Sequence, residues 1–530
     1  MWRVTWDTRR RAGPVPPERT TARPAAFRVG PGTPRDPSAT RRPADSQRVG
    51  RRLSGRDTCC RVWRMFDPED LDADLSVTGH VVTSQREYPR GEVRVRDGRV
   101  LAVRETPSDA PAAERVDAGG AYVLPGVVDP HVHCLSHAGE GIEAATRSAA
   151  AGGVTTLLEM PFDEAGPVWS VDAFRDKRAA VLREAHVDVG MYATVEPGGQ
   201  GIAEIPKLAA EGAACFKLST FQTDPRRFPR TPDGEMLDAF VEIARTGLRV
   251  CVHAENDEIV QRNLGRLRAS GASGPLLHGV SRPPVAETAA VAAVLEFARA
   301  SGVHLHFCHV STPHAVDLVQ WHRRTGTSVT TEVCPHYLTL TEQDMVRGGA
   351  RLKYNPPLRT PAETDGLWHR LRSGALDMVA SDHAPWPLAL KQRDHVLDNA
   401  SGGPGVETLL PLVADAALHE RRMTPRELVR SLSTRAAHAF GLGDRKGDLR
   451  PGLDGDLVIL DPDAEWTVDG SRLRSNAGWS PFDGMRARGR VRCTVSRGEV
   501  IWDGDSVRSA AGRGRFLAPA PFPAPPEEGG

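Results

Sequence analysis

Lysine is scarce in this sequence, which holds 6 Lys against 62 Arg in 530 residues. Also missing is any run of about 18 consecutive apolar residues, so no membrane-spanning helix is predicted. No CxxC pair occurs among the 8 Cys, and Cys215, Cys251 and Cys308 stand in apolar runs, where a thiol behaves as a small core residue. The first residues show no apolar segment typical of a secretory signal. Together these absences predict reduced thiols and a cytoplasmic protein without a membrane partner.

The net charge is zero, but its distribution is uneven. Residues 1–64 hold 16 Arg and 5 acidic residues, a net +11, and the rest of the chain stands at −11. A mildly acidic folded part argues against a nucleic-acid partner. Residues 1–64 are rich in Arg, Pro, Ser and Thr and lack hydrophobic periodicity. We expect a disordered tail there, or sequence that is not translated, rather than a basic arm for nucleic acid or membrane. Met65 is the expected start of the folded protein.

Short strand-like runs stand near both ends of the patterned region. In residues 65–124 an Asp97-Gly98 pair separates two of them, which is typical of a tight hairpin. Residues 441–507 contain runs of the same character. We expect these two segments to pair into one small β-sandwich domain. Residues 508–530 are rich in Pro, Ala and Gly and are predicted to be a loose C-terminal tail.

Between these ends, apolar strands alternate with helical stretches. Eight such units predict an α/β protein with a (β/α)8 barrel over residues 125–440. The strands are expected to begin near Val123, Val154, Val187, Ala213, Leu248, Val303, Ser328 and Leu376.

Side chains that can bind metal stand at the ends of these predicted strands. His131 and His133 are two residues apart on a strand, so both point to one face and can reach one ion. In a barrel the carboxyl ends of the strands surround one mouth, where the active sites of this fold lie. Six candidate ligands therefore converge: His131, His133, Lys217, His253, His309 and Asp382.

Each candidate has an ordinary structural explanation when taken alone. An HxH pair can be structural, His253 can be a core or surface histidine, and Asp382 before a turn can be a cap. Chance rarely places such residues at the same end of strands one, four, five, six and eight. The joint pattern therefore favours a metal site.

Lys217 is one of the few lysines and follows a buried apolar run. A neutral lysine amine can react with CO2 to form a carbamate, whose two oxygens can bridge two metals, whereas arginine stays protonated. The alternative is a strand lysine that extends outward or pairs with a carboxylate. Its place between the HxH pair and the later histidines favours the carbamate.

The sequence resembles the cyclic amidohydrolases, the group of dihydroorotases, allantoinases and hydantoinases. The resemblance covers roughly residues 70–505, and its motifs are highly specific as an ordered set. They are Leu124–His133, Val252–Asn256, Cys308–Thr312, Glu332–Tyr337, Lys353–Arg359 and Ser381–Pro385.

The resemblance implies a barrel with a small β domain and two divalent metals, expected to be zinc. By the family's pattern, His131, His133 and Asp382 bind the more buried metal, His253 and His309 bind the second, and N6-carboxylated Lys217 bridges them. Metals lower the pKa of water and polarise a carbonyl, and the resemblance implies that Asp382 takes the proton of the attacking water and passes it to the leaving ring nitrogen.

Two further residues are implied as substrate contacts. Asn355 is expected to meet the ring amide through its main chain, and Ser401 is a candidate contact to the ring. Each also has an ordinary explanation, Asn355 as a turn residue before Pro356 and Ser401 as a polar loop residue.

The ring itself is predicted by exclusion. Dihydroorotases carry an Arg two residues after the second His and often a His after the Asp-His-Ala-Pro run; here these are Leu135 and Trp386. Without those cations a substrate carboxylate is not favoured. Met160-Pro161, Phe228–Arg230 and Ser281–Pro283 resemble allantoinases, whereas the loop Cys134–Glu140 departs from them and Ser401–Glu407 resembles hydantoinases and dihydroorotases more than allantoinases. Allantoin is the first expected substrate, and the alternative is a hydantoinase or dihydropyrimidinase activity or a dihydroorotase-like one.

Two other classes remain as alternatives. A catalytically inactive scaffold homologue is disfavoured because all six ligand positions are filled. A related hydrolase of non-cyclic substrates, such as a deaminase, is disfavoured by the Pro335–Tyr337 and Asn355–Pro357 runs. The family also implies a homo-oligomer, commonly a tetramer.

Overall fold

The computed structural model describes residues 72–137 and 139–522. The predicted tail at residues 1–64 lies outside this range, as do residues 523–530 of the predicted C-terminal tail. Among the described helices, none has the length and apolar character needed to cross a membrane.

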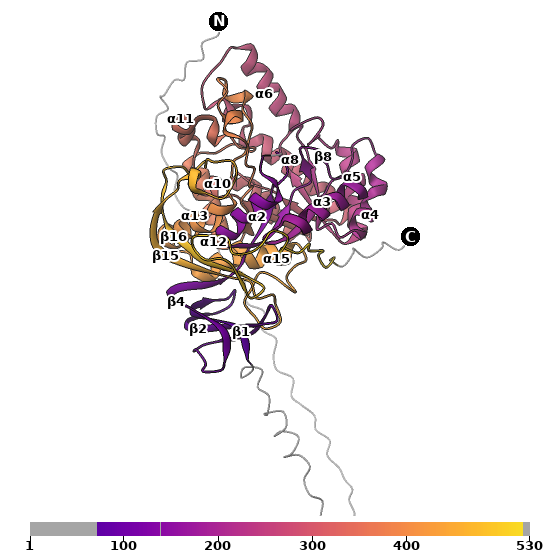
Figure 1. Cartoon of the computed structure of the whole chain (residues 1–530). Helices are drawn as coiled ribbons and strands as arrows, with labels where there is room; N and C mark the ends of the chain where they lie inside the picture. Colours follow the sequence, from indigo (N-terminus) through magenta and orange to yellow (C-terminus); the bar gives the residue numbers. More distant parts are fainter. Residues whose placement is uncertain (1–71, 138, 523–530) are drawn as a thin grey trace, which may run out of the picture. The chain divides into compact units, whose positions relative to one another are not determined.

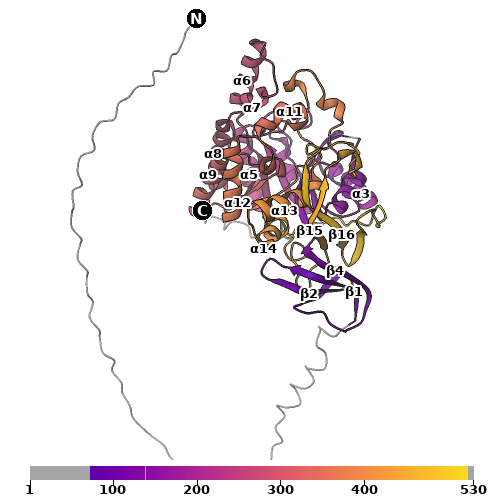
Figure 2. The same cartoon turned by 90° about the vertical axis from the view of Figure 1, so that its left-hand side faces the viewer.

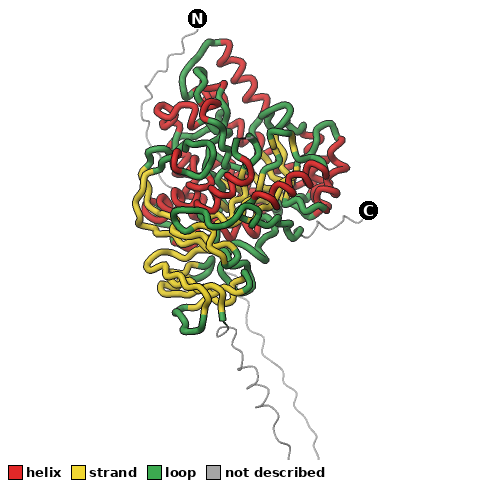
Figure 3. The backbone as a smooth tube through the Cα atoms, viewed as in Figure 1, coloured by secondary structure: helices red, strands yellow, loops and turns green. Residues whose placement is uncertain are grey.

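Eight parallel strands form the predicted barrel (Figures 1 and 3). It closes beyond β14, where the His133 N–H donates to the His383 carbonyl at 2.8 Å. Most of these strands are buried along their length, as expected when helices cover a parallel sheet. In chain order they are β5 (Val127–Val132), β6 (Val154–Glu159), β9 (Asp188–Ala193), β10 (Cys215–Ser219), β11 (Arg249–His253), β12 (His304–Phe307), β13 (Val329–Val333) and β14 (Met378–Val379).

The predicted start of the first barrel strand is four residues early. Val123 belongs to β4 (Ala112–Pro125), where it pairs with Ile459 in the other sheet. The apolar run is continuous through both strands, so hydrophobicity alone does not mark the passage from one sheet to the next. The new strand begins after Gly126, where a Cβ would lie 2.1 Å from the Thr155 hydroxyl oxygen.

Helices follow the barrel strands and cover their outer face (Figure 2). Their ends carry local signals: α8 has Pro284 in its first turn and ends before Gly302, which adopts φ +71°. The helices are α2 (Gly141–Ala151), α3 (Val171–Glu184), α4 (Ile205–Ala210), α5 (Asp233–Thr246), α6 (Asp257–Ala269), α7 (Leu277–Ser281), α8 (Pro284–Ser301), α9 (Pro313–Arg324), α10 (Pro335–Thr339), α11 (Met345–Gly348), α12 (Pro361–Ser373), α13 (Leu409–Asp415), α14 (Pro425–Val429) and α15 (Arg435–Ala439).

A second sheet is built from both ends of the folded region, as predicted. Its strands form one mixed sheet in the order β17-β16-β15-β4-β1-β2-β3. The predicted hairpin joins β2 and β3, with Asp97 at φ +53° and Gly98 at φ +73°. The strands beside β4 are β1 (Ala73–Val82), β2 (Glu87–Arg96), β3 (Arg99–Arg104), β15 (Leu457–Thr467), β16 (Arg486–Ser496) and β17 (Glu499–Trp502); a separate hairpin pairs β7 (Phe162–Asp163) with β8 (Gly166–Pro167).

The prediction of a loose tail from residue 508 is wrong for residues 508–522. Leu517 is fully buried, and its N–H donates to the Val189 carbonyl at 2.9 Å. Phe522 donates from its N–H to the Gly247 carbonyl at 2.9 Å. Proline and alanine carry no strong periodic signal, so the sequence did not reveal that this segment packs against the amino-terminal side of the barrel strands.

Candidate active site

One cavity of about 420 Å³ at the carboxyl ends of the barrel strands is lined by all eight predicted site residues. His131 lies in β5, Lys217 in β10 and His253 at the end of β11, while the other five follow strands or stand in loops. The lining includes His131, His133, Lys217, His253, His309, Asn355, Asp382 and Ser401. The barrel therefore brings together residues that are more than 260 positions apart in the chain.

Around Asp382 the first group of predicted ligands gathers. His131 Nε2 lies 3.3 Å from Asp382 Oδ1, and His133 Nε2 lies 3.6 Å from the same oxygen. These three side chains form a group compact enough to hold one ion. Burial raises the pKa of Asp382, but the two histidines outweigh it and hold that pKa well below its usual range. Asp382 is therefore a carboxylate at neutral pH.

The second group consists of His253 and His309. His253 Nδ1 and His309 Nε2 are 3.0 Å apart, and burial lowers the pKa of both rings. Two neutral imidazoles with nitrogens facing each other present lone pairs to a common point, which suits a cation. His309 Nδ1 is buried and meets no hydrogen-bond partner in the described part of the chain.

His309 and Asp382 share an uncommon backbone conformation. Their φ values are +38° and +48°, in the region that residues other than glycine rarely adopt. Such strain is found where the surrounding structure requires a particular side-chain direction. Here it turns both predicted ligands towards the cavity.

Lys217 differs from the other buried lysines. It is 1% exposed, and its Nζ has neither an ion pair nor a hydrogen bond among the described residues. By contrast, Lys177 Nζ lies 2.6 Å from Asp163 Oδ1, and Lys446 Nζ lies 2.6 Å from Asp188 Oδ2. An unpaired buried amine is costly, so the surroundings of Lys217 fit an amine that is converted to an anion able to bridge two cations.

Glu332 orients one side of the site. It lies in β13, accepts from His131 Nδ1 and His306 Nε2, the latter at 3.1 Å, and also accepts from the His309 N–H at 3.1 Å. Burial opposes ionisation of Glu332, but His131 and His306 hold its pKa well below the usual range. A carboxylate on the far nitrogen of a ligand histidine fixes the ring and its tautomer. The sequence placed Glu332 in a motif without giving it this role.

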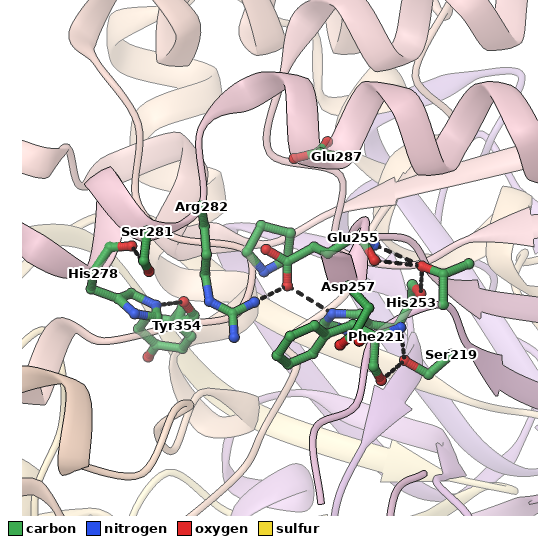
Figure 4. A network of polar contacts seen from close by, with 12 residues as sticks. Ser219, Phe221, His253, Glu255, Asp257, His278, Ser281, Arg282, Glu287 and Tyr354 are labelled. Carbon is green, nitrogen blue, oxygen red and sulfur yellow. Dashed lines mark hydrogen bonds and ion pairs between the residues drawn. The ribbon is translucent and has the colours of Figure 1, made fainter. Parts of the chain in front are cut away.

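Glu255 plays the equivalent part for the second group (Figure 4). His253 Nε2 lies 2.9 Å from Glu255 Oε2, and Arg282 Nη1 donates to the same oxygen. The guanidinium of Arg282 also lies 4.2 Å from the centre of the Phe221 ring. Sequence reasoning missed both Glu255 and Arg282, since no local spacing reveals that they meet.

The outer wall of the cavity is aromatic, and sequence reasoning missed this wall too. Phe162 and Phe228 stack with ring centres 3.6 Å apart. The Arg227 guanidinium lies 5.0 Å from the Trp386 ring centre and donates to the Ser136 carbonyl. These residues come from loops after different strands, so their meeting depends on the closed barrel.

A parallel barrel whose mouth joins four histidines, a lysine and an aspartate defines a class of metal-dependent hydrolases. Residues 122–501 match the amidohydrolase family. An L-hydantoinase of Paenarthrobacter aurescens is 34% identical over 450 residues, covering 84% of this chain and 98% of that protein. An allantoinase of Rubrobacter xylanophilus is 37% identical over 432 residues, covering 81% and 94%.

Solved structures agree with this relationship. The L-hydantoinase from Arthrobacter aurescens superposes with a TM-score of 0.81 at 34% identity, covering 84% of this chain and all of that one. A dihydropyrimidinase from Brevibacillus agri superposes with a TM-score of 0.77 at 27% identity, covering 85% and 99%. The chain belongs to the amidohydrolase family, and the predicted kinship with allantoinases and hydantoinases is confirmed.

Proposed function

We propose that this enzyme opens the ring of a cyclic amide by hydrolysis, with allantoin, opened to allantoate, as its first candidate substrate. The observation that carries the proposal is the convergence in one cavity of two histidine pairs, an ionised aspartate and a buried lysine that has no hydrogen-bond partner in the described part of the chain. This donor set suits two divalent cations bridged by an anion.

The residues present fit such a metal pair. His131, His133 and Asp382 would hold one ion, His253 and His309 the other, and a carboxylated Lys217 would join them. Among the described residues Lys217 Nζ has no hydrogen-bond partner, and it is the atom that the bridging role would satisfy. When bound, the ions, proposed to be zinc, would lower the pKa of water and polarise the ring carbonyl.

The protein's own residues carry the proton and hold the ring. Asp382, ionised and beside both His131 and His133, is placed to accept the proton of the attacking water and to donate it to the departing ring nitrogen. The main chain of Asn355 and the side chain of Ser401 line the same cavity and are proposed to hold the ring amide. Phe162 and Phe228 limit the access of bulk water on one side.

Two cations that line the cavity, Arg282 and Lys353, are not available to a substrate carboxylate. Leu135, where dihydroorotases carry an arginine, packs against the core instead. Arg282 is paired with Glu255, and Lys353 Nζ donates to the carbonyls of Leu397 and Asn399. These cations are already engaged, so a negatively charged substituent would find no free partner among them.

A hydantoinase or dihydropyrimidinase activity is the second candidate, and a specific observation favours it. The stacked Phe162 and Phe228 rings present an apolar face to the cavity. This face suits an apolar substituent on the substrate ring better than it suits a ureido group. Arg227, which precedes Phe228 in the chain and lines the same cavity, offers donors that suit the ureido carbonyl of allantoin. The two candidates therefore differ in whether the substituent meets the phenylalanine rings or the guanidinium group.

The test is a substrate screen with purified, zinc-loaded enzyme. Allantoin, hydantoin, 5-phenylhydantoin, dihydrouracil and dihydroorotate are compared by kcat/KM for ring opening, with Asp382→Asn as the inactive control. We expect allantoin to lead and dihydroorotate to come last. If the enzyme hydrolyses none of the five compounds, the proposal is refuted. Bound metal well below two ions per chain would favour the inactive scaffold.

Three further expectations stay predictions at this point. The identity of the metal is tested by elemental analysis of the purified protein. The homotetramer implied by the family is tested by light scattering, and the cytoplasmic location by fractionation of cells.

A further inference from the structure

Five of the six lysines of this chain are buried. Lys177 and Lys446 meet carboxylates, and Lys217 has the bridging role proposed above. Lys353 and Lys391, which are 5% and 2% exposed, donate to main-chain carbonyls instead. A buried amine needs acceptors, and here the acceptors are neutral, so these two lysines hold main chain in place rather than balance a charge.

The side-chain nitrogen of Lys391 lies among three main-chain carbonyls. Its Nζ donates to the carbonyl oxygens of Lys353 at 3.0 Å, Ala400 at 3.0 Å and Gly402 at 2.7 Å. An ammonium group carries three N–H donors on one nitrogen, so the acceptors match its donors in number. Burial and the charge of Lys353 lower the pKa of Lys391, whereas these acceptors favour the protonated form, since a neutral amine offers only two N–H groups.

The three carbonyls belong to two segments that line the active-site cavity. One is that of Lys353, two residues before Asn355, and the other two stand on either side of Ser401. All of these residues line the cavity. Lys391 is buried and is not one of the lining residues, so it reaches both segments from behind the cavity wall.

Residues 399–402 form no helix or strand, so their carbonyls depend on other donors. The carbonyls of these four consecutive residues each accept from a side chain: in chain order, the donors are Lys353, Lys391, Trp386 and again Lys391. The Gly402 N–H in turn donates to the Lys353 carbonyl at 2.8 Å. The main chain on both sides of Ser401 is therefore held at every carbonyl.

We propose that Lys391 is a positioning residue for substrate binding, which clamps the segment of Ser401 to the segment of Asn355 so that both can contact one ring. The inference rests on the proposed function, because Asn355 and Ser401 are the proposed contacts to the ring amide. Lys391 acts only through the three carbonyls that it binds, and it contacts neither the proposed metal ligands nor the cavity.

The shape of the ammonium group explains why a lysine stands here in a chain with 62 Arg. A guanidinium group spreads its N–H donors over three nitrogens in one plane, whereas the three carbonyls converge on one atom. The space is also confined, since Lys391 Nζ lies 5.8 Å from the Tyr354 ring centre and 5.7 Å from that of Trp479. Lys391→Arg should therefore keep the charge and lose the geometry.

The kinetic test uses Lys391→Met, which keeps an unbranched side chain and removes all three donors. The zinc-loaded variant is assayed with whichever of the five screened compounds the wild type hydrolyses best. We expect KM to rise about tenfold or more, while kcat stays within about threefold because the metal ligands and Asp382 keep their places. A raised KM with little change in kcat is the signature of a lost contact that the substrate and the transition state share.

Two control variants separate positioning from a general loss of stability. Lys207→Met removes an exposed lysine, and Leu517→Ala weakens packing on the amino-terminal side of the barrel strands; both should keep KM within about twofold. An equal rise of KM in Leu517→Ala and Lys391→Met would show that lost stability is the cause, and this result would overturn the proposal. An unchanged KM in folded Lys391→Met would do the same.

Lys391→Arg keeps the test decisive if Lys391→Met does not fold. This variant retains a buried positive charge, and we expect it to fold with a KM raised at least about fivefold. Thermal unfolding of each variant without substrate checks that the fold is intact. A folded Lys391→Arg with the KM of the wild type would refute the argument from the ammonium geometry.

Hydrogen exchange separates the clamp from the proposed function, because it is measured without substrate. The amides of residues 397–403 should exchange at least about tenfold faster in Lys391→Met than in the wild type, and those of β10 at the same rate in both. Equal exchange in residues 397–403 would refute the clamp even in an active enzyme. If the wild type hydrolyses none of the five compounds, the proposed function fails, while the exchange rates still decide whether Lys391 holds this segment.

Discussion

Replacing Glu332 by glutamine tests how the proposed metal site is held. The side chain keeps its shape but loses the charge that accepts from His131 Nδ1, His306 Nε2 and the His309 N–H. One of its two oxygens becomes an NH2 group, which cannot accept. Glu332→Gln therefore removes the charge from three hydrogen bonds of a fully buried side chain.

The size of the effect follows from these contacts. A hydrogen bond to a charged group contributes about 1.5–3 kcal/mol and a neutral one about 0.5–1.5 kcal/mol. Because the three bonds share one carboxylate, their losses do not add. We expect Glu332→Gln to lose about 2–4 kcal/mol of hydrogen-bond stabilisation in total. Loss of a carboxylate behind a ligand histidine typically lowers metal affinity about 10–100-fold. The expected fall in kcat/KM is of the same order.

The assay is metal retention against increasing chelator, measured beside kcat/KM. The control is Glu114→Gln, an exposed glutamate on β4, which belongs to the other sheet and not to the barrel; this variant should leave both quantities unchanged. If Glu332→Gln retains metal as the wild type does and keeps kcat/KM within about twofold, Glu332 does not orient the ligands. In that case His131 and His309 are held by packing alone.

Three other predictions concern the lysine, the pH dependence and the C-terminal segment. Lys217→Ala should abolish most activity and the retention of two metals, with partial rescue by short carboxylic acids; full activity would refute the carbamate. Lys446 and Arg497 outweigh burial and lower the pKa of Asp188 from 3.8 to about 2, so Asp188 contributes about 2.5 kcal/mol of stability above pH 4 that is lost as the pH falls towards 2. Chemical unfolding at both pH values should show this loss in the wild type and a smaller one in Asp188→Asn; an equal loss in both would refute it. Leu517→Ala should lower the free energy of unfolding by about 2–5 kcal/mol, and Leu182→Ala, at an exposed position, by less than about 0.5 kcal/mol; similar urea midpoints for the two would show that residues 508–522 do not hold the barrel.

Local pattern was enough to predict the barrel and six of the residues that line its mouth, whereas Asn355 and Ser401 came from the resemblance to the cyclic amidohydrolases. Alternating strands and helices imply parallel strands, and parallel strands end at a common edge. The spacing of His131 and His133 follows from the two-residue repeat of a strand. Each of these arguments needs only neighbouring residues and chain order.

Local pattern could not predict which side chains contact each other across the barrel. His131 and Glu332 are 201 residues apart, and Glu255 meets Arg282 across 27 residues and two helices. A strand pattern gives the direction of a side chain but not the residue it faces. Glu332 and Glu255 could therefore be recognised in the sequence as members of motifs, but their role in orienting the histidines could not be predicted.

The chain's own order of residues thus determined the fold class, the strand ends and the kinds of ligand, because these depend on periodicities of two and about 3.6 residues. Closure of the barrel and packing of distant segments decided the rest: the left-handed turns at His309 and Asp382, the lack of a partner for Lys217 Nζ among the described residues, and the docking of residues 508–522. These features depend on which surfaces meet, and that is set by the summed packing of the whole chain rather than by any local run of residues.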